Sequence, residues 1–328
     1  MLVDIAIYLI RIALTLFIIF GTIGNILNVL IFIRPKLLQS SCTIYLLVTS
    51  IDNIFVLYLN VLTRVLANGF SIDVTTTSNF LCKFRFYVGY VCLAVSPYWL
   101  ILACFDRYCA SSSSTTKRAW CNKKTAIKSS IGAFILACLL YLHMAIFFEI
   151  KYVNNGKMCY SRTGVYDLFY RIFYLIIYCI VPSVCMGIIC VLTLKNIRQQ
   201  AQRINPALTN GRQSLRRIDQ QIIRMLIGQI LTQLVCILPF AIFNVIGLFV
   251  NTTTALYNFF LQIVTIPLFV SYATSFYIFT LSSRIYRQEL KKIIYFWRPI
   301  QYENDQTMDN SISMTVNPYQ QKSKMTTQ

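Results

Sequence analysis

Residues 80–108 read FLCKFRFYVGYVCLAVSPYWLILACFDRY, and this stretch decides the fold. Its central part, residues 86–105, contains no charged side chain. The 25 residues from Cys82 to Arg107 would extend about 37 Å as an α-helix. The hydrocarbon core of a bilayer is about 30 Å thick. The stretch therefore predicts a helix that crosses a membrane, with Cys82 at one face of the membrane and Arg107 at the other.

The whole chain has the composition of a membrane protein. Hydrophobic residues make up 57% of its 328 residues and charged residues 12%. Soluble domains have about 45–50% apolar and about 25% charged residues, so most of this chain cannot face water. Strands of outer-membrane barrels alternate polar and apolar positions over about ten residues. The apolar stretches here are continuous and longer, which favours helices over a barrel.

Seven stretches are long enough to cross a bilayer, which requires about 20 apolar residues. They are residues 8–33, 43–66, 80–105, 126–148, 168–194, 221–250 and 255–281. The sequence therefore predicts an all-α membrane protein with a seven-transmembrane helix bundle.

An amphipathic eighth helix is predicted over residues 283–297. Its apolar residues recur at helical spacing, and basic residues fill the other face. This pattern is typical of a helix that lies along the membrane surface. The alternative is a solvated, basic helix end, but the aromatic run 295–297 favours the membrane.

The basic residues indicate the orientation of the chain. If the N-terminus lies outside, 22 of the 30 Lys and Arg residues fall on the cytoplasmic side and 8 on the outer side. Cytoplasmic loops of membrane proteins are enriched in Lys and Arg. We therefore expect the N-terminus outside and the C-terminus in the cytoplasm. The same distribution accounts for the net charge of +19 without a nucleic-acid partner.

Asp52 lies near the middle of the second predicted span. A carboxylate at this depth costs several kcal/mol unless it has a partner, so such residues usually have a function. The alternative is a structural group that hydrogen-bonds between helices. Asn25 in the first span is the expected neighbour.

Most of the twelve cysteines lie inside apolar stretches, where cysteine behaves as a small hydrophobic residue. Cys82 and Cys159 are the two that fall in the predicted outer loops, where oxidation is possible. We expect them to form a disulfide; two free thiols are the alternative. Metal and redox motifs are not found, and the single histidine, His143, lies inside a span as a packed core residue would.

Several motifs occur in the order and spacing of one receptor family. They are Gly24-Asn25 in the first span, Asp52 in the second, Cys82 and Asp106-Arg107-Tyr108 around the third, Cys159 in the second outer loop, Pro182 in the fifth and Cys236-Ile237-Leu238-Pro239 in the sixth. Residues 285–290 resemble the start of the family's surface helix. Across roughly residues 10–298, the chain resembles a rhodopsin-like (class A) G protein-coupled receptor of the peptide-receptor kind.

The chain departs from the family pattern at four places. The fourth span contains no Trp, and Ile237 occupies the usual position of the aromatic switch in the sixth span. The Asn-Pro-x-x-Tyr pattern of the seventh span is replaced by residues 275–279, which read SFYIF, and Cys190 replaces a tyrosine in the fifth span. These changes affect how activation would pass through the core.

The resemblance implies three parts and a cellular location. These are a short extracellular N-terminus (1–7), a seven-transmembrane receptor domain (8–298) and a disordered cytoplasmic tail (299–328). The protein would lie in the plasma membrane, bind an extracellular ligand and activate a heterotrimeric G protein. Phosphorylated Ser and Thr residues of the tail would bind arrestin.

The resemblance also assigns the residues that couple to the G protein. They are Asp106, Arg107, Tyr108, Asp219 and Pro239, with Asn25, Asp52 and Pro182 in structural roles. Arg107 would pair with Asp106 and Asp219 at rest, and the alternative for Asp219 is a solvated side chain in a basic loop. Pro239 would allow the sixth span to kink and swing outward, because proline removes a helix hydrogen bond.

Four residues align with the family's sodium positions. These are Asp52, Ser96, Ser271 and Ser275. Their oxygen atoms suit a hard cation. An allosteric sodium ion is therefore the one cofactor that the resemblance implies.

Residues at two places in the chain argue against two classes of ligand. Amine receptors carry an acid in the third span where this chain has Gly89, and opsins need a lysine that residues 255–281 do not contain. A receptor for a peptide is the leading hypothesis. The alternative is an orphan chemosensory receptor for a small molecule. The candidate pocket residues are Tyr90, Phe240, Phe243, Asn244 and Gln262, for which helix packing is the alternative role. Asn251 begins a glycosylation sequon.

Two other classes of protein fit the sequence less well. A transporter would show inverted repeats or several charges inside the membrane, and here Asp52 alone lies deep. A membrane enzyme would need paired acids or a nucleophile with its base, and a single histidine leaves little from which to build one. We therefore expect a receptor and not an enzyme.

Overall fold

The computed structural model describes residues 2–153, 156–202, 210–250 and 254–296. Seven of its helical stretches are long and apolar enough to cross a membrane. They are Asp4–Phe32, Ser41–Gly69, Asn79–Ala110, Lys123–Phe147, Val165–Gln199, Gln220–Ile246 and Leu256–Ala273. The predicted seven-helix bundle is confirmed, and each span lies within a few residues of its predicted position, although the predicted seventh span is divided between two helices.

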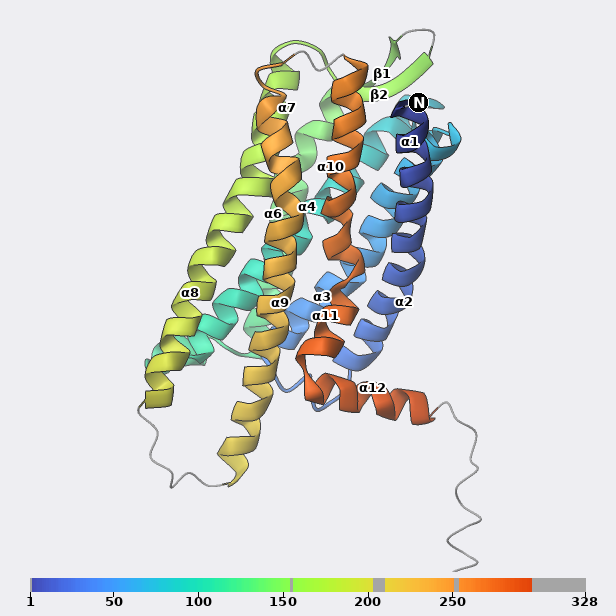
Figure 1. Ribbon diagram of the computed structural model, residues 1–328. Helices are drawn as coiled ribbons and strands as arrows, with labels where there is room; N and C mark the ends of the chain where they lie inside the picture. Colours follow the sequence, from blue (N-terminus) through green and yellow to red (C-terminus); the bar gives the residue numbers. More distant parts are fainter. Residues whose placement is uncertain (1, 154–155, 203–209, 251–253, 297–328) are drawn as a thin grey trace, which may run out of the picture.

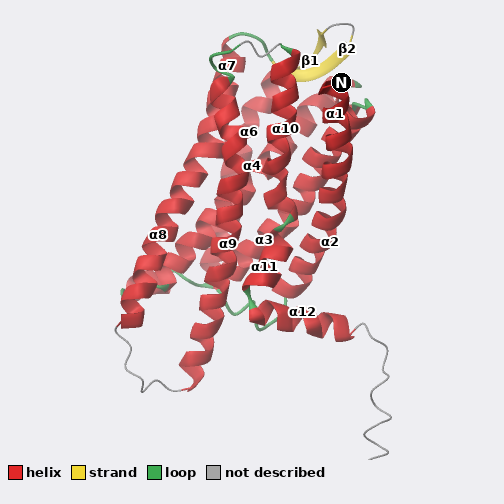
Figure 2. Ribbon diagram, viewed as in Figure 1, coloured by secondary structure: helices red, strands yellow, loops and turns green. Residues whose placement is uncertain are grey.

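The spans run side by side and form one bundle (Figures 1 and 2). The first contains α1 (Leu2–Leu9), η1 (Ile10–Leu14) and α2 (Thr15–Phe32), and the second contains α3 (Ser41–Val56), η2 (Leu57–Leu62) and η3 (Val65–Gly69). The third is α4 (Asn79–Ala110), and the fourth is α6 (Lys123–Phe147). The fifth contains α7 (Val165–Tyr174), η5 (Leu175–Ile180) and α8 (Val181–Gln202); the sixth is α9 (Asn210–Ile246); the seventh contains α10 (Ala255–Ala273) and α11 (Ser275–Ser282).

The two ends of the bundle differ. At one end, the N-terminal end of α1 lies near a hairpin of β1 (Phe148–Val153) and β2 (Gly156–Ser161) (Figure 1). At the other end, α12 (Arg284–Phe296) turns sideways from the direction of the spans and extends outward at the foot of the bundle (Figure 1). We call these the hairpin end and the α12 end. A short helix, α5 (Thr115–Ala119), and a 3-10 turn, η4 (Val74–Thr76), complete the described elements.

Four π-helical segments lie in the halves of the first, second and fifth spans that are nearer the hairpin: η1, η2, η3 and η5. A π-turn inserts a residue into a helix and re-aims the side chains that follow, and such turns are frequent at functional sites. The sequence analysis did not predict them. Two of them, η2 and η3, contribute residues to the cavity described below.

The amphipathic helix is confirmed at α12, and its buried face is fixed by Tyr286. This side chain is fully buried and packs edge-on against Phe32 and Phe279. Burial raises the pKa of Tyr286, and its hydroxyl donates a short hydrogen bond to Asn28. Tyr286 therefore anchors the first turn of α12 to the first and seventh spans.

The core has two buried apolar clusters, one in each half of the bundle. The cluster of the hairpin half includes Val95 and Tyr178, and the cluster of the α12 half includes Phe32 and Leu100. Many large apolar side chains on the outer surface are exposed, for example Leu139 at 64%. In a membrane protein these side chains face lipid, so their exposure does not destabilise the fold.

Candidate functional site

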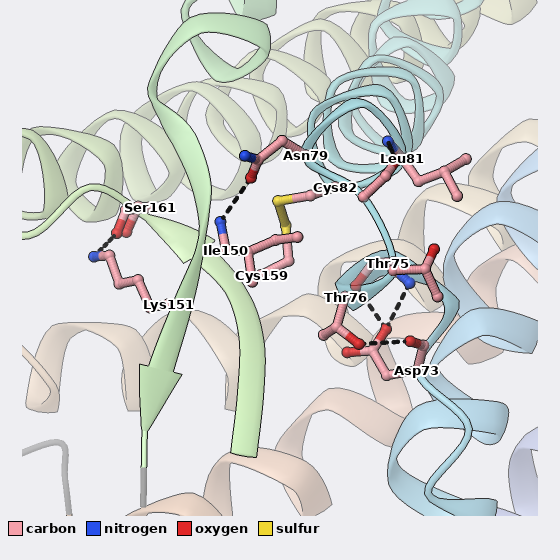
Figure 3. The surroundings of a disulfide bond; sticks show 12 residues. Asp73, Thr75, Thr76, Asn79, Leu81, Cys82, Ile150, Lys151, Cys159 and Ser161 are labelled. Atoms are coloured by element: carbon pink, nitrogen blue, oxygen red, sulfur yellow. Dashed lines mark hydrogen bonds between the residues drawn. A yellow bond between two sulfur atoms is a disulfide. The ribbon is translucent and has the colours of Figure 1, made fainter. Parts of the chain in front are cut away.

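A disulfide joins the start of α4 to strand β2 at the hairpin end (Figure 3). The Cα atoms of Cys82 and Cys159 are 5.6 Å apart, and both side chains are buried. Beside it, the backbone N–H of Ile150 on β1 donates to the Asn79 side chain at 3.4 Å. The predicted disulfide is therefore present, and it holds the hairpin over the third span.

A cavity of about 320 Å³ lies beneath the hairpin. Its wall is formed by residues of the second, third, fifth, sixth and seventh spans, and β2 contributes Met158, Cys159 and Tyr160. Leu93, Leu268 and other apolar side chains line it together with several tyrosines. Ligand pockets in proteins have volumes of about 300–1,000 Å³, so this cavity is at the small end of that range.

Aromatic residues of the third and fifth spans form one side of the cavity. The Tyr90 and Tyr170 hydroxyls share a short hydrogen bond. Tyr174 packs edge-on against both Tyr90 and Phe240, with ring centroids 5.3 Å and 5.8 Å away. These rings connect α4, α7 and α9, so a ligand in the cavity would contact three spans at once.

Three arginines line the cavity: Arg64, Arg85 and Arg171. Arg171 pairs with Asp167 at 2.9 Å and donates to the Tyr160 hydroxyl at 3.0 Å. Burial raises the pKa of Tyr160 to about 12, although the Arg171 charge acts in the opposite direction. Tyr160 is therefore a neutral hydroxyl at the rim at physiological pH.

A buried polar network crosses the middle of the bundle. Asn53 donates to the Asn25 side chain at 3.2 Å and accepts from the Ser96 hydroxyl at 3.1 Å. Asn25 also accepts from Ser275 at 3.1 Å and donates to the carbonyl of Tyr272 at 2.9 Å. The network joins the first, second, third and seventh spans. Its hydrogen bonds satisfy buried amide groups, which would destabilise the fold if they had no partners.

Arg107 lies at the α12 end, opposite the cavity. Its guanidinium pairs with Asp106 at 2.6 Å, and the two side chains are 4% and 5% exposed. Asp106 also accepts from the Ser41 hydroxyl at 2.6 Å. Tyr108 is half-buried, and its hydroxyl accepts from Lys117 at 3.2 Å. The third span therefore ends in a buried, hydrogen-bonded ion pair.

Hydrogen bonds hold α9 to its neighbours near this end. The Gln221 side chain accepts from the Ser283 hydroxyl at 3.1 Å and from the Ile285 N–H at 2.8 Å. Gln229 donates to the carbonyl of Ser271 at 3.0 Å. Any movement of α9 away from the bundle would break these three hydrogen bonds.

Residues 24–277 match the family described as 7 transmembrane receptor (rhodopsin family). The chain belongs to the rhodopsin family of seven-transmembrane receptors. It is also similar to somatostatin receptor type 4 of Rattus norvegicus, with 21% identity over 260 residues. The match covers 78% of this chain but 64% of that receptor, slightly less than two thirds of its length. A receptor of this family is a multi-pass membrane protein and not an enzyme, as predicted.

The rhodopsin-family receptor has three of the five candidate pocket residues in its cavity. Tyr90, Phe240 and Asn244 line it, whereas Phe243 and Gln262 are not among the lining residues. Phe243 instead stacks on Tyr257, with ring centroids 4.8 Å apart. Helix spacing could not separate the two groups, because the rotation of each span in the bundle decides which side chains face inward.

Asp52 does not occupy the position that the resemblance implies. Its neighbour Asn53 makes the hydrogen bonds to Asn25 and Ser96, and one carboxylate oxygen of Asp52 is buried without a hydrogen-bond partner. The Cys92 thiol is the titratable side chain that most affects the Asp52 carboxylate. Asn25 therefore forms its hydrogen bond to the second span with Asn53 and not with Asp52. Asn53 was not among the predicted site residues, because an acid inside a span is the stronger signal of function.

The hydroxyls of the three serine candidates for sodium binding each donate a hydrogen bond to a group other than Asp52. Ser96 donates to Asn53, Ser271 donates to the carbonyl of Leu268 and Ser275 donates to Asn25. None of these hydroxyls binds Asp52, and groups of three or more His, Cys, Asp or Glu side chains are absent from the described residues. Sodium binding at these residues therefore stays a prediction.

The remaining candidates lie where the sequence placed them along the chain. Pro182 is buried in the first turn of α8, directly after η5, and Pro239 is inside α9. The backbone of Asp219 belongs to α9, but its side chain lies outside the described residues, as does Asn251. Arg64 and Arg85 line the cavity but were not among the predicted pocket residues, although two basic residues inside predicted outer segments were a usable signal.

Proposed function

We propose that this receptor binds an extracellular peptide in the cavity beneath the hairpin and activates a heterotrimeric G protein at the α12 end. The N-terminus would lie outside the plasma membrane and the C-terminus in the cytoplasm. The observation that carries the proposal is the buried Arg107–Asp106 pair, which lies at the end of the bundle opposite the cavity. A site for the ligand and a site for the partner are thus at opposite faces of the membrane.

The orientation is supported by chemistry at both ends. The disulfide requires an oxidising compartment, which the hairpin end would meet outside the cell. The α12 end carries most of the basic residues, in agreement with their enrichment in cytoplasmic segments. Arrestin binding to the phosphorylated tail, residues 299–328, would take place on the same side.

The resting state would be held by contacts around α9. A small space between the third, fifth and sixth spans is lined by Arg107 and by Leu226, Ile230 and other apolar side chains. Outward movement of α9 about Pro239 would open this space and expose Arg107 to the G protein. A ligand causes such a shift only if it binds the open state more tightly than the closed state.

A peptide ligand is supported by the similarity to a receptor named for somatostatin. The aromatic and polar lining of the cavity also suits peptide side chains. Gly89 carries no side chain in the third span, and a Cβ there would lie 2.8 Å from the Asn60 side-chain oxygen. Asn60 therefore fills the space that an acid would need, which argues against an amine ligand.

The coupling proposal is tested without a ligand by basal nucleotide exchange. Purified receptor in lipid nanodiscs is assayed with a panel of heterotrimeric G proteins. Asp106→Asn should raise basal exchange by about fivefold, because weakening the restraint on Arg107 by about 1 kcal/mol shifts a two-state population by that factor. Adding Arg107→Ala should abolish the increase.

The matched control is Arg118→Ala, an exposed arginine in the loop after the third span. It should leave exchange unchanged. Exchange by the Asp106→Asn/Arg107→Ala variant as fast as that by Asp106→Asn would reject Arg107 as the coupling residue. Peptide-library screening on cells, read out with the same G proteins, then tests the class of ligand against small molecules.

A further inference from the structure

The cavity beneath the hairpin contains two arginines that form no ion pair with any acid of the described residues. Arg64 lies between η2 and η3, and Arg85 lies in the second turn of α4. Both side chains are half-buried and line the cavity. Among the residues that the structure describes, neither arginine takes part in an ion pair. Charged groups inside a membrane protein are rare and usually have a function.

Most of the hydrogen-bond donors of these two side chains are unused. A guanidinium has five N–H donors. Arg85 directs two nitrogens at one acceptor, the Thr63 hydroxyl, at 3.2 Å and 2.7 Å. For Arg64, the described contact is with the ring of Phe269, whose centroid is 6.0 Å away. Neither side chain has a buried, unpartnered nitrogen, so the free donors of both are open to the cavity.

The acidic residues near the cavity are already engaged. Asp73 is the acid among its described lining residues, and it accepts from the backbone N–H and the hydroxyl of Thr75 at 2.9 Å and 2.6 Å. Asp167 neutralises Arg171. The charges of Arg64 and Arg85 repel each other, and the charge of Asp73 offsets part of this repulsion at Arg85. An anion placed between them would remove this repulsion.

We propose that Arg64 and Arg85 bind the free C-terminal carboxylate of a peptide ligand. The inference rests on the proposed function, which makes the ligand a peptide. Arginine matches a carboxylate with two parallel hydrogen bonds. A cavity of about 320 Å³ has room for the end of a peptide and not for its whole length. The rings of Tyr90 and Phe240 suit an aromatic side chain beside the carboxylate.

The same carboxylate chemistry could come from an acidic side chain or a small organic acid, and four probes separate these sources. They are N-acetyl-Phe-Tyr with a free C-terminus, the same dipeptide as its C-terminal amide, N-acetyl-Asp-Tyr amide and 3-phenylpropionate. Binding to the full-length receptor in nanodiscs is measured by saturation-transfer NMR. The free acid should bind at least about tenfold more tightly than the amide, because charge-assisted hydrogen bonds are about twice as strong as neutral ones.

Substitutions then locate the site. Arg64→Gln and Arg85→Gln should each reduce binding of the free acid to the level of the amide, and Arg64→Lys should have an intermediate effect because it keeps the charge and loses the fork. Arg162→Gln is the matched control, since Arg162 pairs with Glu149 on the exposed hairpin surface and does not line the cavity. Thermal unfolding confirms folding, and Arg64→Gln should not lower the midpoint.

Three results would overturn the proposal: equal binding of acid and amide, no binding of the free acid to the wild-type receptor, or full binding by both glutamine variants. Tighter binding of the Asp-containing amide or of 3-phenylpropionate would reject the peptide C-terminus as the source. Basal nucleotide exchange by the Asp106→Asn receptor tests G protein coupling separately, because this substitution lies outside the cavity. Arg64-dependent binding without that exchange would reject the proposed coupling and leave this inference intact.

Discussion

Asn53, and not the predicted Asp52, makes the hydrogen bonds to Asn25 and Ser96, which shows the limit of prediction for single residues. Neighbouring residues on a helix point about 100° apart, so which one faces the network depends on the rotation of the whole span. Sequence reasoning chose the acid because an ionisable group in a membrane usually has a function. The structure instead places the amide at the point where four spans meet.

The two residues should differ in their contribution to stability. Asn53→Ala should lower the free energy of unfolding by about 2 kcal/mol, because it leaves buried partners unsatisfied. Asp52→Asn should change it by less than about 0.5 kcal/mol, because one oxygen of Asp52 has no hydrogen bond to lose. Thermal unfolding of the purified receptor measures both. A larger loss with Asp52→Asn would contradict the arrangement.

At the scale of elements, hydropathy predicted the spans but not the features inside and between them. The π-helical segments follow from packing between helices, which a single apolar stretch does not encode. The β1–β2 hairpin had a usable signal: its sequence places Asn-Gly at residues 155–156, between stretches of high β-propensity. The break between α10 and α11, at Thr274, lies where the family's proline motif is missing.

The connection between α9 and α12 through Gln221 should restrain the resting state. Gln221→Leu has a similar size and removes the hydrogen bonds to Ser283 and Ile285. Because two hydrogen bonds contribute about 1–3 kcal/mol, basal nucleotide exchange should rise at least about fivefold. The adjacent exposed residue provides the control, Gln220→Leu, which should behave as wild type. Unchanged exchange by Gln221→Leu would show that α9 moves without breaking this contact.

At the scale of the molecule, the bundle followed from the sequence because each apolar stretch must cross the membrane somewhere. The cavity did not follow, because its charge depends on which faces of five spans turn inward. Arg64 and Arg85 are not among the motif residues that carry the resemblance, so the resemblance did not indicate them. The site specific to this receptor was therefore the part that sequence comparison could not supply.

The disulfide should stabilise the hairpin end and with it the cavity. It closes a loop of 77 residues between Cys82 and Cys159, and the loss of such a bridge typically costs about 2–4 kcal/mol. The Cys82→Ser/Cys159→Ser receptor should unfold at a lower temperature than Cys138→Ser, which removes a free thiol. Equal midpoints, or alkylation of both thiols in the unreduced wild-type protein, would show that the bridge does not form.

Because α12 would lie at the membrane surface, the surrounding lipid should affect the equilibrium between the closed and open positions of α9. Its exposed face carries Arg284, Lys291 and Lys292, and anionic headgroups attract such residues by about 1 kcal/mol each. A leaflet rich in phosphatidylserine would stabilise α12 at the membrane surface. The hydrogen bonds of Gln221 would then stabilise the closed position of α9. Nucleotide exchange should then be slower in phosphatidylserine nanodiscs than in phosphatidylcholine, and Gln221→Leu should erase the difference. Two cells that express the same receptor but differ in the lipid composition of the inner leaflet would therefore differ in ligand-free nucleotide exchange.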